Sequence, residues 1–231
     1  MQNDSAEPLV GPLGEVPNLG ERVLRRLREL LVVGTLSGGT PLRQRELASQ
    51  LGVSQTPVRD SLLQLEREGL VTMYNNGRAF ASHLTREDLE ELYAMRLGLE
   101  GLAARLGAER VADADVATMK TLLAELGDLA SFGDTGAYLS RRWEFHATCY
   151  QAAQRPRLLL RVERLFWAAE RYNRLLLSTP ERFDQSLAHY NRFLEVVEAR
   201  DGPRAERAFQ DSARWAIEAL TPVLPLEAQA P

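Results

Sequence analysis

The amino-acid sequence predicts a mostly α-helical protein with a small N-terminal domain of three helices and a β-hairpin, followed by a bundle of six antiparallel helices. Two observations predict this fold class. Residues 42–82 contain two short helical patterns, a glycine between them and a hairpin signal, in that order. The rest of the chain is helical in pattern, with no internal repeat and no alternation of strands and helices. We therefore place one domain at 19–82 and another at 85–221, between flexible tails at 1–18 and 222–231.

Leucine spacing defines the first two helices of the N-terminal domain. Leu47 and Leu51 lie four residues apart on one face of a short helix, and Gly52 ends this helix because glycine adopts the left-handed C-cap conformation without strain. Ahead of it, apolar residues recur at helical spacing and predict a longer helix that closes a small core. These residues are Val23, Leu24, Leu27, Leu30 and Leu31.

The third helix has one apolar face and one polar face. Ser54 is placed to cap it, Pro57 lies in its first turn, where a missing N–H costs little, and Gly69 follows its end. Its buried stripe is predicted to be Val58, Leu62 and Leu65. The opposite face carries polar side chains near the N-terminus, where a recognition helix contacts base edges and where the helix dipole favours phosphate. These side chains are Gln55, Thr56 and Arg59.

A β-hairpin follows the three helices. Residues 70–74 and 78–82 flank an Asn-Asn-Gly turn, and an Asn-Gly pair suits a tight turn that needs positive φ. The tip of the hairpin, with Asn76, Gly77 and Arg78, is predicted to be the wing of a winged helix-turn-helix, a module that binds double-stranded DNA. Two helices joined at a glycine also occur in other helical proteins, but here four elements agree in order and spacing.

Charge is distributed unevenly between the two domains. Residues 19–82 contain nine arginines and six acidic residues, a net charge of +3, so the remainder of the chain sums to -7 within the total of -4. A charge of +3 is small for a module that binds duplex DNA. We therefore expect two copies to act together, as a homodimer on a palindromic operator.

Composition narrows the class of protein further. Cys149 is the only cysteine, so no intramolecular disulfide can form. The sequence has no export signal and no apolar run long enough to span a membrane, and we expect a cytoplasmic protein. The three histidines are scattered, and no glycine-rich phosphate loop or nucleophile with an adjacent base is visible, so we expect no enzymatic activity.

The C-terminal domain begins directly after the hairpin. Thr85 and Asp88 form a capping pair that predicts the start of a long helix, and only His83 and Leu84 separate this helix from the wing. A link this short predicts that movement in the bundle is transmitted to the N-terminal domain. Glycine and proline residues divide the domain into six helices, at about 86–109, 113–131, 135–153, 156–178, 181–200 and 203–221.

Polar side chains interrupt the inward-facing apolar stripes of four of these helices. Arg96 lies in the middle of the first stripe, and Arg142 lies one turn before His146 in the third helix. Tyr190 and Ser212 fall on the stripes of the fifth and sixth helices. Because a helical bundle builds its binding sites from side chains that point into its core, these five residues form the predicted ligand site.

These motifs resemble a known family. The run ELASQLGVSQTPVRDSLLQLEREGLV, followed by the NNG wing, resembles the winged-helix domain of GntR-family transcriptional regulators. The runs TREDLEELYAMRLGLEGLAARLGA, WEFH and FLEVVEARDGPRAERAF resemble the all-helical ligand-binding FCD domain of the FadR-like subgroup. The resemblance covers about residues 20–221.

The resemblance assigns the DNA contacts of the family to the second helix, the third helix and the wing. Gly77 and its neighbours supply the wing contacts. Gln55 stands where the family commonly has arginine, so the operator sequence does not transfer from relatives. For Arg45, the alternative is a surface ion pair with a nearby carboxylate. The helix residues implied are Arg45, Ser54, Gln55, Thr56 and Arg59.

The resemblance also raises the question of a metal. Many FCD domains bind a divalent metal through an Asp and a His four residues apart and a His on each of two later helices. The corresponding positions here are Arg142, His146, Tyr190 and Ser212. Arginine does not lose its proton to coordinate a metal, and its charge repels one. We therefore expect no metal cofactor, and the alternative of a degenerate metal site requires His189 to turn inward.

Two buried cations need matching charges, and an organic carboxylate or phosphate supplies them through forked hydrogen bonds. We therefore expect a ligand-responsive repressor whose effector is a small organic acid or another anionic metabolite. One alternative is that Glu100 pairs with Arg96 inside the protein, while Arg142 reaches another carboxylate or the surface. Another is a constitutive, dimeric DNA-binding protein that has no effector and a filled interior.

Overall fold

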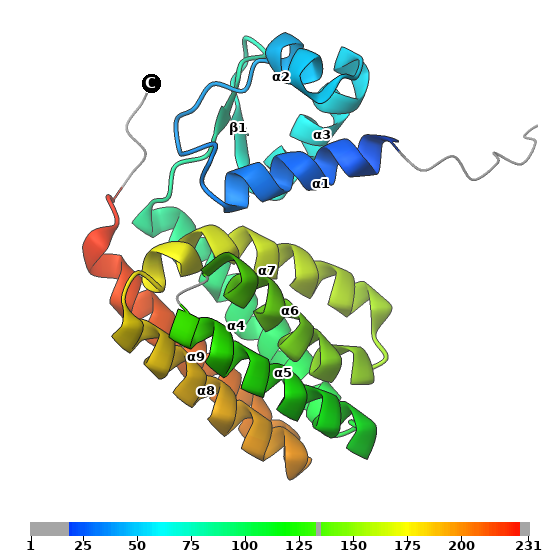
Figure 1. Ribbon diagram of the computed structural model, residues 1–231, viewed down its shortest axis with the longest axis vertical. Coiled ribbons are helices and arrows are strands. Elements are labelled where there is room, and N and C mark those ends of the chain that lie inside the picture. Colours follow the sequence, from blue (N-terminus) through cyan, green and yellow to red (C-terminus); the bar gives the residue numbers. More distant parts are fainter. Residues whose placement is uncertain (1–18, 133–134, 227–231) are drawn as a thin grey trace, which may run out of the picture.

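The computed structural model describes residues 19–132 and 135–226, which form a small mixed domain packed on a larger all-helical one (Figure 1). Each of the two parts has its own hydrophobic core. The predicted fold class is therefore confirmed, whereas the predicted tail at 1–18 lies outside the described residues. No helix in the described part of the chain is long and apolar enough to cross a membrane.

Three helices and one hairpin form the small domain. Gly52 adopts a φ of +67° and ends the second helix, as its position predicts. The stripe of the third helix is buried, with Val58 and Leu65 fully enclosed between this helix and the first. The elements are α1 (Leu19–Val32), α2 (Gln44–Leu51), α3 (Gln55–Arg67), β1 (Val71–Met73) and β2 (Ala79–Ala81).

The two strands of the wing pair antiparallel, with Val71 opposite Ala81. Five residues, 74–78, connect them, and the N–H of Tyr74 donates to the carbonyl of Arg78 at 2.9 Å, which leaves a three-residue loop at 75–77. The N–H of Gly77 donates to the carbonyl of Tyr74 at 2.8 Å. Gly77 adopts a φ of +77°, which is the conformation for which a glycine is favoured in a three-residue hairpin loop.

A short extended segment before α2 pairs with the wing. The N–H of Leu42 donates to the carbonyl of Ala79 at 2.8 Å, and the N–H of Ala81 donates to the carbonyl of Thr40 at 2.9 Å. This pairing was not predicted from the sequence, because the segment is too short to show an alternating pattern and contains Pro41. The pairing anchors the base of the wing to the helical part of the domain.

Six long helices form the bundle, and each begins and ends within two residues of its predicted bounds. The first of them packs against the third, fourth and sixth, and so lies at the centre of the domain (Figure 1). The helices are α4 (Arg86–Ala108), α5 (Asp113–Phe132), α6 (Thr135–Ala152), α7 (Pro156–Leu176), α8 (Pro180–Glu198) and α9 (Gly202–Leu220).

The close crossing of α4 and α6 depends on Gly107. A Cβ atom added at this position would lie 2.1 Å from the carbonyl oxygen of Cys149. We expect Gly107→Ala to lower the free energy of unfolding by about 2 kcal/mol, because backbone must move to admit the methyl group. Gly127→Ala is the control, since nothing lies within 4 Å of its added Cβ and alanine favours helix by about 1 kcal/mol. Equal effects of the two substitutions in urea denaturation would contradict this account.

The predicted C-terminal tail at 222–231 begins with an ordered segment. A 3-10 turn, η1 (Thr221–Val223), follows α9, and Leu224 is buried against the bundle core. The carbonyl of Pro225 accepts a hydrogen bond of 2.8 Å from the N–H of Arg86. The prediction of a tail from residue 222 is wrong for this stretch, because one buried leucine and one backbone hydrogen bond are too little to show in a sequence pattern.

The link between the domains is held by α7. Thr85 caps α4, and its hydroxyl accepts from the N–H of Asp88 at 3.1 Å, which confirms the predicted capping pair. The hydroxyl of Tyr172 donates to the Asp88 carboxylate at 2.6 Å and also bonds the backbone of Thr85. The guanidinium of Arg171 donates to the carbonyl of Ser82, directly before the link. The link is therefore fixed to the bundle and is not a free tether.

Candidate functional site

The N-terminal end of α3 presents an exposed polar surface. Ser54, Gln55, Thr56 and Arg59 are all exposed, as the two-faced pattern predicts. Ser54 occupies the N-cap position, but its side chain makes no capping hydrogen bond. The predicted capping role is therefore wrong, and the hydroxyl is free to contact a partner.

A consequence is that Ser54→Ala should leave stability nearly unchanged. Loss of an N-cap hydrogen bond usually costs about 1 kcal/mol, whereas a change at an exposed, unbonded side chain stays within about 0.5 kcal/mol. Thr85→Ala, which removes the observed cap of α4, is the matched control and should show the larger loss. Urea denaturation of both variants checks this, and a loss near 1 kcal/mol for Ser54→Ala would show that the hydroxyl caps the helix after all.

The other predicted DNA contacts are also exposed. Arg45 has no ion pair among the residues that the structure describes, and the nearby pair at 2.8 Å joins Arg43 and Glu46 instead. In the wing, the Asn76 side chain accepts from the N–H of Arg78 at 3.0 Å, and the Arg78 guanidinium lies over the Phe80 ring. The turn of the hairpin that follows β1 lies at the end of the molecule that is far from the bundle (Figure 1).

In the bundle, the five predicted ligand-site residues line one small cavity. Arg96 comes from α4, Arg142 and His146 from α6, Tyr190 from α8 and Ser212 from α9. The cavity has a volume of about 20 Å³, which is enough for roughly one water molecule. A metabolite would need neighbouring side chains to move.

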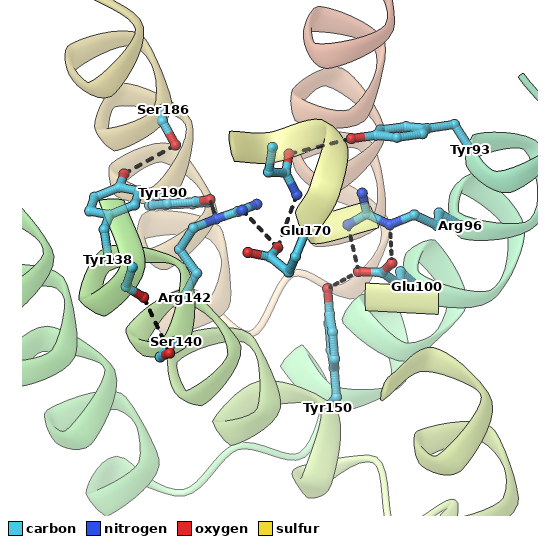
Figure 2. A network of polar contacts seen from close by, with 12 residues as sticks. Tyr93, Arg96, Glu100, Tyr138, Ser140, Arg142, Tyr150, Glu170, Ser186 and Tyr190 are labelled. Atoms are coloured by element: carbon cyan, nitrogen blue, oxygen red, sulfur yellow. Dashed lines mark hydrogen bonds and ion pairs between the residues drawn. The ribbon is translucent and has the colours of Figure 1, made fainter. Parts of the chain in front are cut away.

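Both arginines at this cavity already have carboxylate partners (Figure 2). Arg96 pairs with Glu100 on the same helix, with Nε and Oε1 2.5 Å apart, and this internal pair is one of the alternatives left open by the sequence. Arg142 pairs with Glu170, with Nη1 and Oε1 2.9 Å apart, and its Nε donates to the Tyr190 hydroxyl. Both pairs correspond to the alternative in which Glu100 pairs with Arg96 and Arg142 reaches another carboxylate.

Glu170 is the residue that sequence reasoning missed. It lies on α7, four residues after the fully buried Phe166, so helical periodicity alone places it on the inward face. Burial raises the pKa of this carboxyl group, while Arg142 and the side chain of Asn173 act to lower it. For each arginine, burial is the largest influence and acts to lower the pKa, but the carboxylate partner and the neighbouring tyrosines together outweigh it and hold the pKa above its ordinary value. Both arginines therefore keep their positive charge.

His146 is enclosed by aromatic rings and cations. Its ring centroid lies 5.2 Å from that of Tyr190 and 5.4 Å from that of Phe193. Burial, together with the charges of Arg142 and Arg96, lowers the pKa of His146 well below its usual range. The imidazole is therefore neutral at physiological pH.

This donor set does not fit a divalent metal. The described residues contain no group of three or more His, Cys, Asp or Glu side chains placed to hold an ion. Two guanidinium groups stand beside His146, and His189 lies outside the cavity, with its ring 5.1 Å from that of Trp215. A metal ligand cannot be an arginine, which keeps its proton. The absence of a metal cofactor remains a prediction that metal analysis of the purified protein would test.

The lowered pKa of His146 predicts a specific dependence of stability on pH. In the unfolded chain this histidine takes up a proton at a higher pH than in the folded protein, so stability present above about pH 6.5 is lost as the pH falls. We expect His146→Gln to reduce the decrease in melting temperature between about pH 7.5 and pH 5. His83→Gln is the control. If His146→Gln leaves the dependence of the melting temperature on pH unchanged, the conclusion that His146 is enclosed and neutral is wrong.

Comparisons with known proteins agree with this architecture. Residues 19–80 match the model of the bacterial regulatory proteins of the gntR family, and residues 91–214 match the FCD domain. A relative from Paenarthrobacter nicotinovorans, named "Probable D-xylose utilization operon transcriptional repressor", is 28% identical over 195 residues, which are 80% of this chain and 83% of the relative. The gluconate operon transcriptional repressor of Bacillus licheniformis is 27% identical, over 76% of this chain and 71% of its own length.

A solved structure has the same fold. The structure of McbR/YncC from E. coli aligns with a TM-score of 0.79 and 24% sequence identity, over 90% of this chain and 99% of that one. This likeness concerns the fold, while the family models cover most of the chain. The chain belongs to the GntR family of bacterial regulatory proteins, and it is a transcriptional regulator, not an enzyme, with an N-terminal winged helix-turn-helix and a C-terminal FCD domain.

Proposed function

We propose that this regulator is a cytoplasmic, homodimeric repressor that binds operator DNA through α3 and the wing and releases or retains it in response to an anionic effector. The effector is a small organic acid or a similar metabolite bound between Arg96 and Arg142. The names of two relatives include the word repressor, which supports repression as the mode of action.

One observation supports an anionic ligand in spite of the internal ion pairs. Among the described residues, neither Nη1 of Arg96 nor Nη2 of Arg142 has a hydrogen-bond partner, although both side chains line the cavity. Each guanidinium group therefore keeps an unused donor there. A carboxylate or phosphate is the ligand that forms the strongest hydrogen bonds with such donors. The hydroxyl of Ser212, which is partly exposed, adds a further donor at the rim.

Helix α7 connects this cavity to the DNA-binding domain. Glu170 and Asn173 bond to each other and border the cavity. Between them in the sequence, Arg171 bonds the carbonyl of Ser82, and Tyr172 bonds Asp88 at the start of α4. A ligand that shifts α7 therefore acts directly on the link between the domains. Such a shift changes operator affinity to the extent that the ligand prefers one arrangement over the other.

An exposed apolar face on α4 supports dimerisation. This helix is apolar on its inner face, yet Met95 and Leu102 on its outer face are 44% and 41% exposed, with Leu99 between them. The three residues recur at intervals of four and three, so they form one stripe. A second copy packed on this stripe would bury it and place two wings for a palindromic operator.

A thermal-shift screen tests the effector proposal. The purified protein is heated with organic acids, phosphorylated metabolites and divalent metals, with and without chelator. We expect an acid to stabilise the wild-type protein, to do so equally with chelator, and to lose its effect in Arg142→Lys, which keeps the charge but loses the guanidinium fork. Stabilisation by a metal that chelator reverses would overturn the proposal.

The small cavity also favours a second candidate function, that of a constitutive DNA-binding dimer without effector. The paired arginines and the volume of about 20 Å³ are what this alternative requires. It predicts that no acid in the screen stabilises the protein and that the Arg142→Lys variant behaves as the wild type towards every compound.

A further inference from the structure

The ion pair between Glu170 and Arg142 is incomplete on both sides. Glu170 is fully buried, and its Oε1 accepts from Arg142 Nη1 and from Asn173 Nδ2, each at 2.9 Å. Its other oxygen, Oε2, is buried without any hydrogen-bond partner among the described residues. Arg142 in turn uses Nε for Tyr190 and Nη1 for Glu170, while Nη2 remains unused. A free oxygen and a free nitrogen thus remain in one buried pair.

The neighbouring pair of Arg96 and Glu100 shows how a complete pair looks (Figure 2). Both oxygens of Glu100 are engaged there: Oε1 accepts from Arg96 Nε at 2.5 Å, and Oε2 accepts from Arg96 Nη2 and from the Tyr150 hydroxyl, each at 3.3 Å. The two residues also lie four apart on the same helix, so their backbones keep a fixed separation. Glu170 approaches Arg142 from a different helix and holds it by a single oxygen.

A small carboxylate can bind Arg142 better than Glu170 does. A guanidinium group binds a carboxylate most strongly when two parallel N–H groups meet both oxygens. Nη1 and Nη2 of Arg142 are both available for such a bidentate arrangement once Glu170 withdraws, whereas Glu170 itself engages Arg142 through Oε1 alone.

We propose that Glu170 is an internal carboxylate that occupies Arg142 in place of the effector's carboxylate, and that the effector binds by replacing it there. This inference rests on the proposed function, since the replaced contact belongs to the effector site. The displaced Glu170 keeps its bond from Asn173, and both burial and the loss of its contact with Arg142 favour uptake of a proton by its carboxyl group. Because Arg171 and Tyr172 follow it directly in α7, the exchange occurs next to the contacts that hold the interdomain link.

The test is to remove the internal carboxylate and supply one from solution. Glu170→Ala leaves Arg142 unpaired and opens space beside it, so its melting temperature should fall below that of the wild type. Sodium acetate should then raise the melting temperature of Glu170→Ala in a saturable manner, relative to sodium chloride at the same ionic strength. The wild-type protein should show no such response at the same concentrations, because acetate must first displace Glu170 and lacks the further contacts of a whole effector. Acetamide, which has the shape of acetate without its charge, should have no effect on either protein.

Two variants serve as controls. Asn173→Ala removes a bond to the same carboxylate oxygen but keeps the carboxylate, so acetate should leave it unaffected. The double variant Glu170→Ala with Arg142→Ala lacks the cation and should also not respond. If Glu170→Ala does not yield folded protein, the same melting-temperature measurement is made on Glu170→Gln, with formate in place of acetate. Glutamine keeps the shape of the glutamate side chain without its charge.

Two results would overturn the inference. In the first, acetate stabilises Glu170→Ala no more than chloride or acetamide does. In the second, acetate stabilises Asn173→Ala as much as it stabilises Glu170→Ala. Both outcomes differ from failure of the proposed function. If an acid stabilises the wild type through Arg142 but acetate does not raise the melting temperature of Glu170→Ala, the effector proposal is supported and the inference about Glu170 is wrong. If acetate raises the melting temperature of Glu170→Ala but no acid stabilises the wild type, the inference that Glu170 occupies Arg142 is supported and the effector proposal is wrong.

Discussion

Arg142→Ala should lower the free energy of unfolding by about 3–5 kcal/mol, because it leaves the carboxylate of Glu170 buried without its cation. The loss should depend on pH. The folded-state pKa of Glu170 is already raised by burial, and removal of Arg142 takes away the strongest influence that lowers it. Stability contributed by the protonated form is present at low pH and is lost as the pH rises through the folded-state pKa. The deficit should therefore be larger near about pH 8 than near about pH 5.

Arg141→Ala is the matched control for this prediction. Arg141 is the next residue of α6 and also pairs with carboxylates, among them Glu125 at 2.9 Å, but its side chain is more than one-third exposed. An exposed pair of this kind contributes at most about 1 kcal/mol. Urea denaturation at both pH values separates the two variants. Similar losses for Arg141→Ala and Arg142→Ala would show that Glu170 does not depend on its cation.

Arg59→Ala should weaken operator binding roughly 100-fold, equivalent to about 3 kcal/mol, because Arg59 is the only cation of the exposed N-terminal surface of α3 defined by Ser54, Gln55, Thr56 and Arg59. If Arg59 contacts a phosphate, the dependence of log affinity on log salt should become shallower by about one unit. If it contacts guanine, discrimination at one base pair should relax instead. Fluorescence anisotropy with duplexes selected by the wild-type protein from a random pool measures both quantities.

The control for Arg59 lies on the same helix. Arg67 is also exposed but stands in the last turn of α3, where it borders a cleft between the two domains. Arg67→Ala should leave operator affinity within a few-fold of the wild-type value, since a recognition helix contacts base edges with its N-terminal part. An Arg67→Ala variant as weak as Arg59→Ala would mean that α3 is not oriented as a recognition helix.

Much of the fold could be predicted from the sequence because it depends on patterns among residues that are close together in the chain. The apolar stripe of α3, the glycine stop at Gly52 and the cap at Thr85 each depend on residues within one or two turns of each other. The extended segment around Pro41 and the buried Leu224 depend on contacts between distant parts of the chain. Sequence periodicity carries no information on such contacts, so they could not be predicted from it.

In the candidate site, too, local patterns could be predicted and contacts between distant residues could not. Helical periodicity placed Arg96, Arg142 and His146 correctly at one cavity, because it reports which side chains face inward. It does not report which inward-facing groups on different helices meet. The pairing of Arg142 with Glu170 joins α6 and α7, so it depends on the rotation and height of one helix against another. The DNA-contact residues are predicted by family resemblance and exposure alone, and their test is the Arg59 experiment.

The most direct test of the account is the operator affinity of the wild-type protein with and without a stabilising acid at saturation. We expect the acid to change the dissociation constant for the selected operator by roughly 5- to 150-fold, the usual range of coupling between two sites. The same acid should leave the operator affinity of Arg142→Lys unchanged. An acid that binds the wild type but leaves its operator affinity the same would contradict the claim that the bundle cavity controls DNA binding.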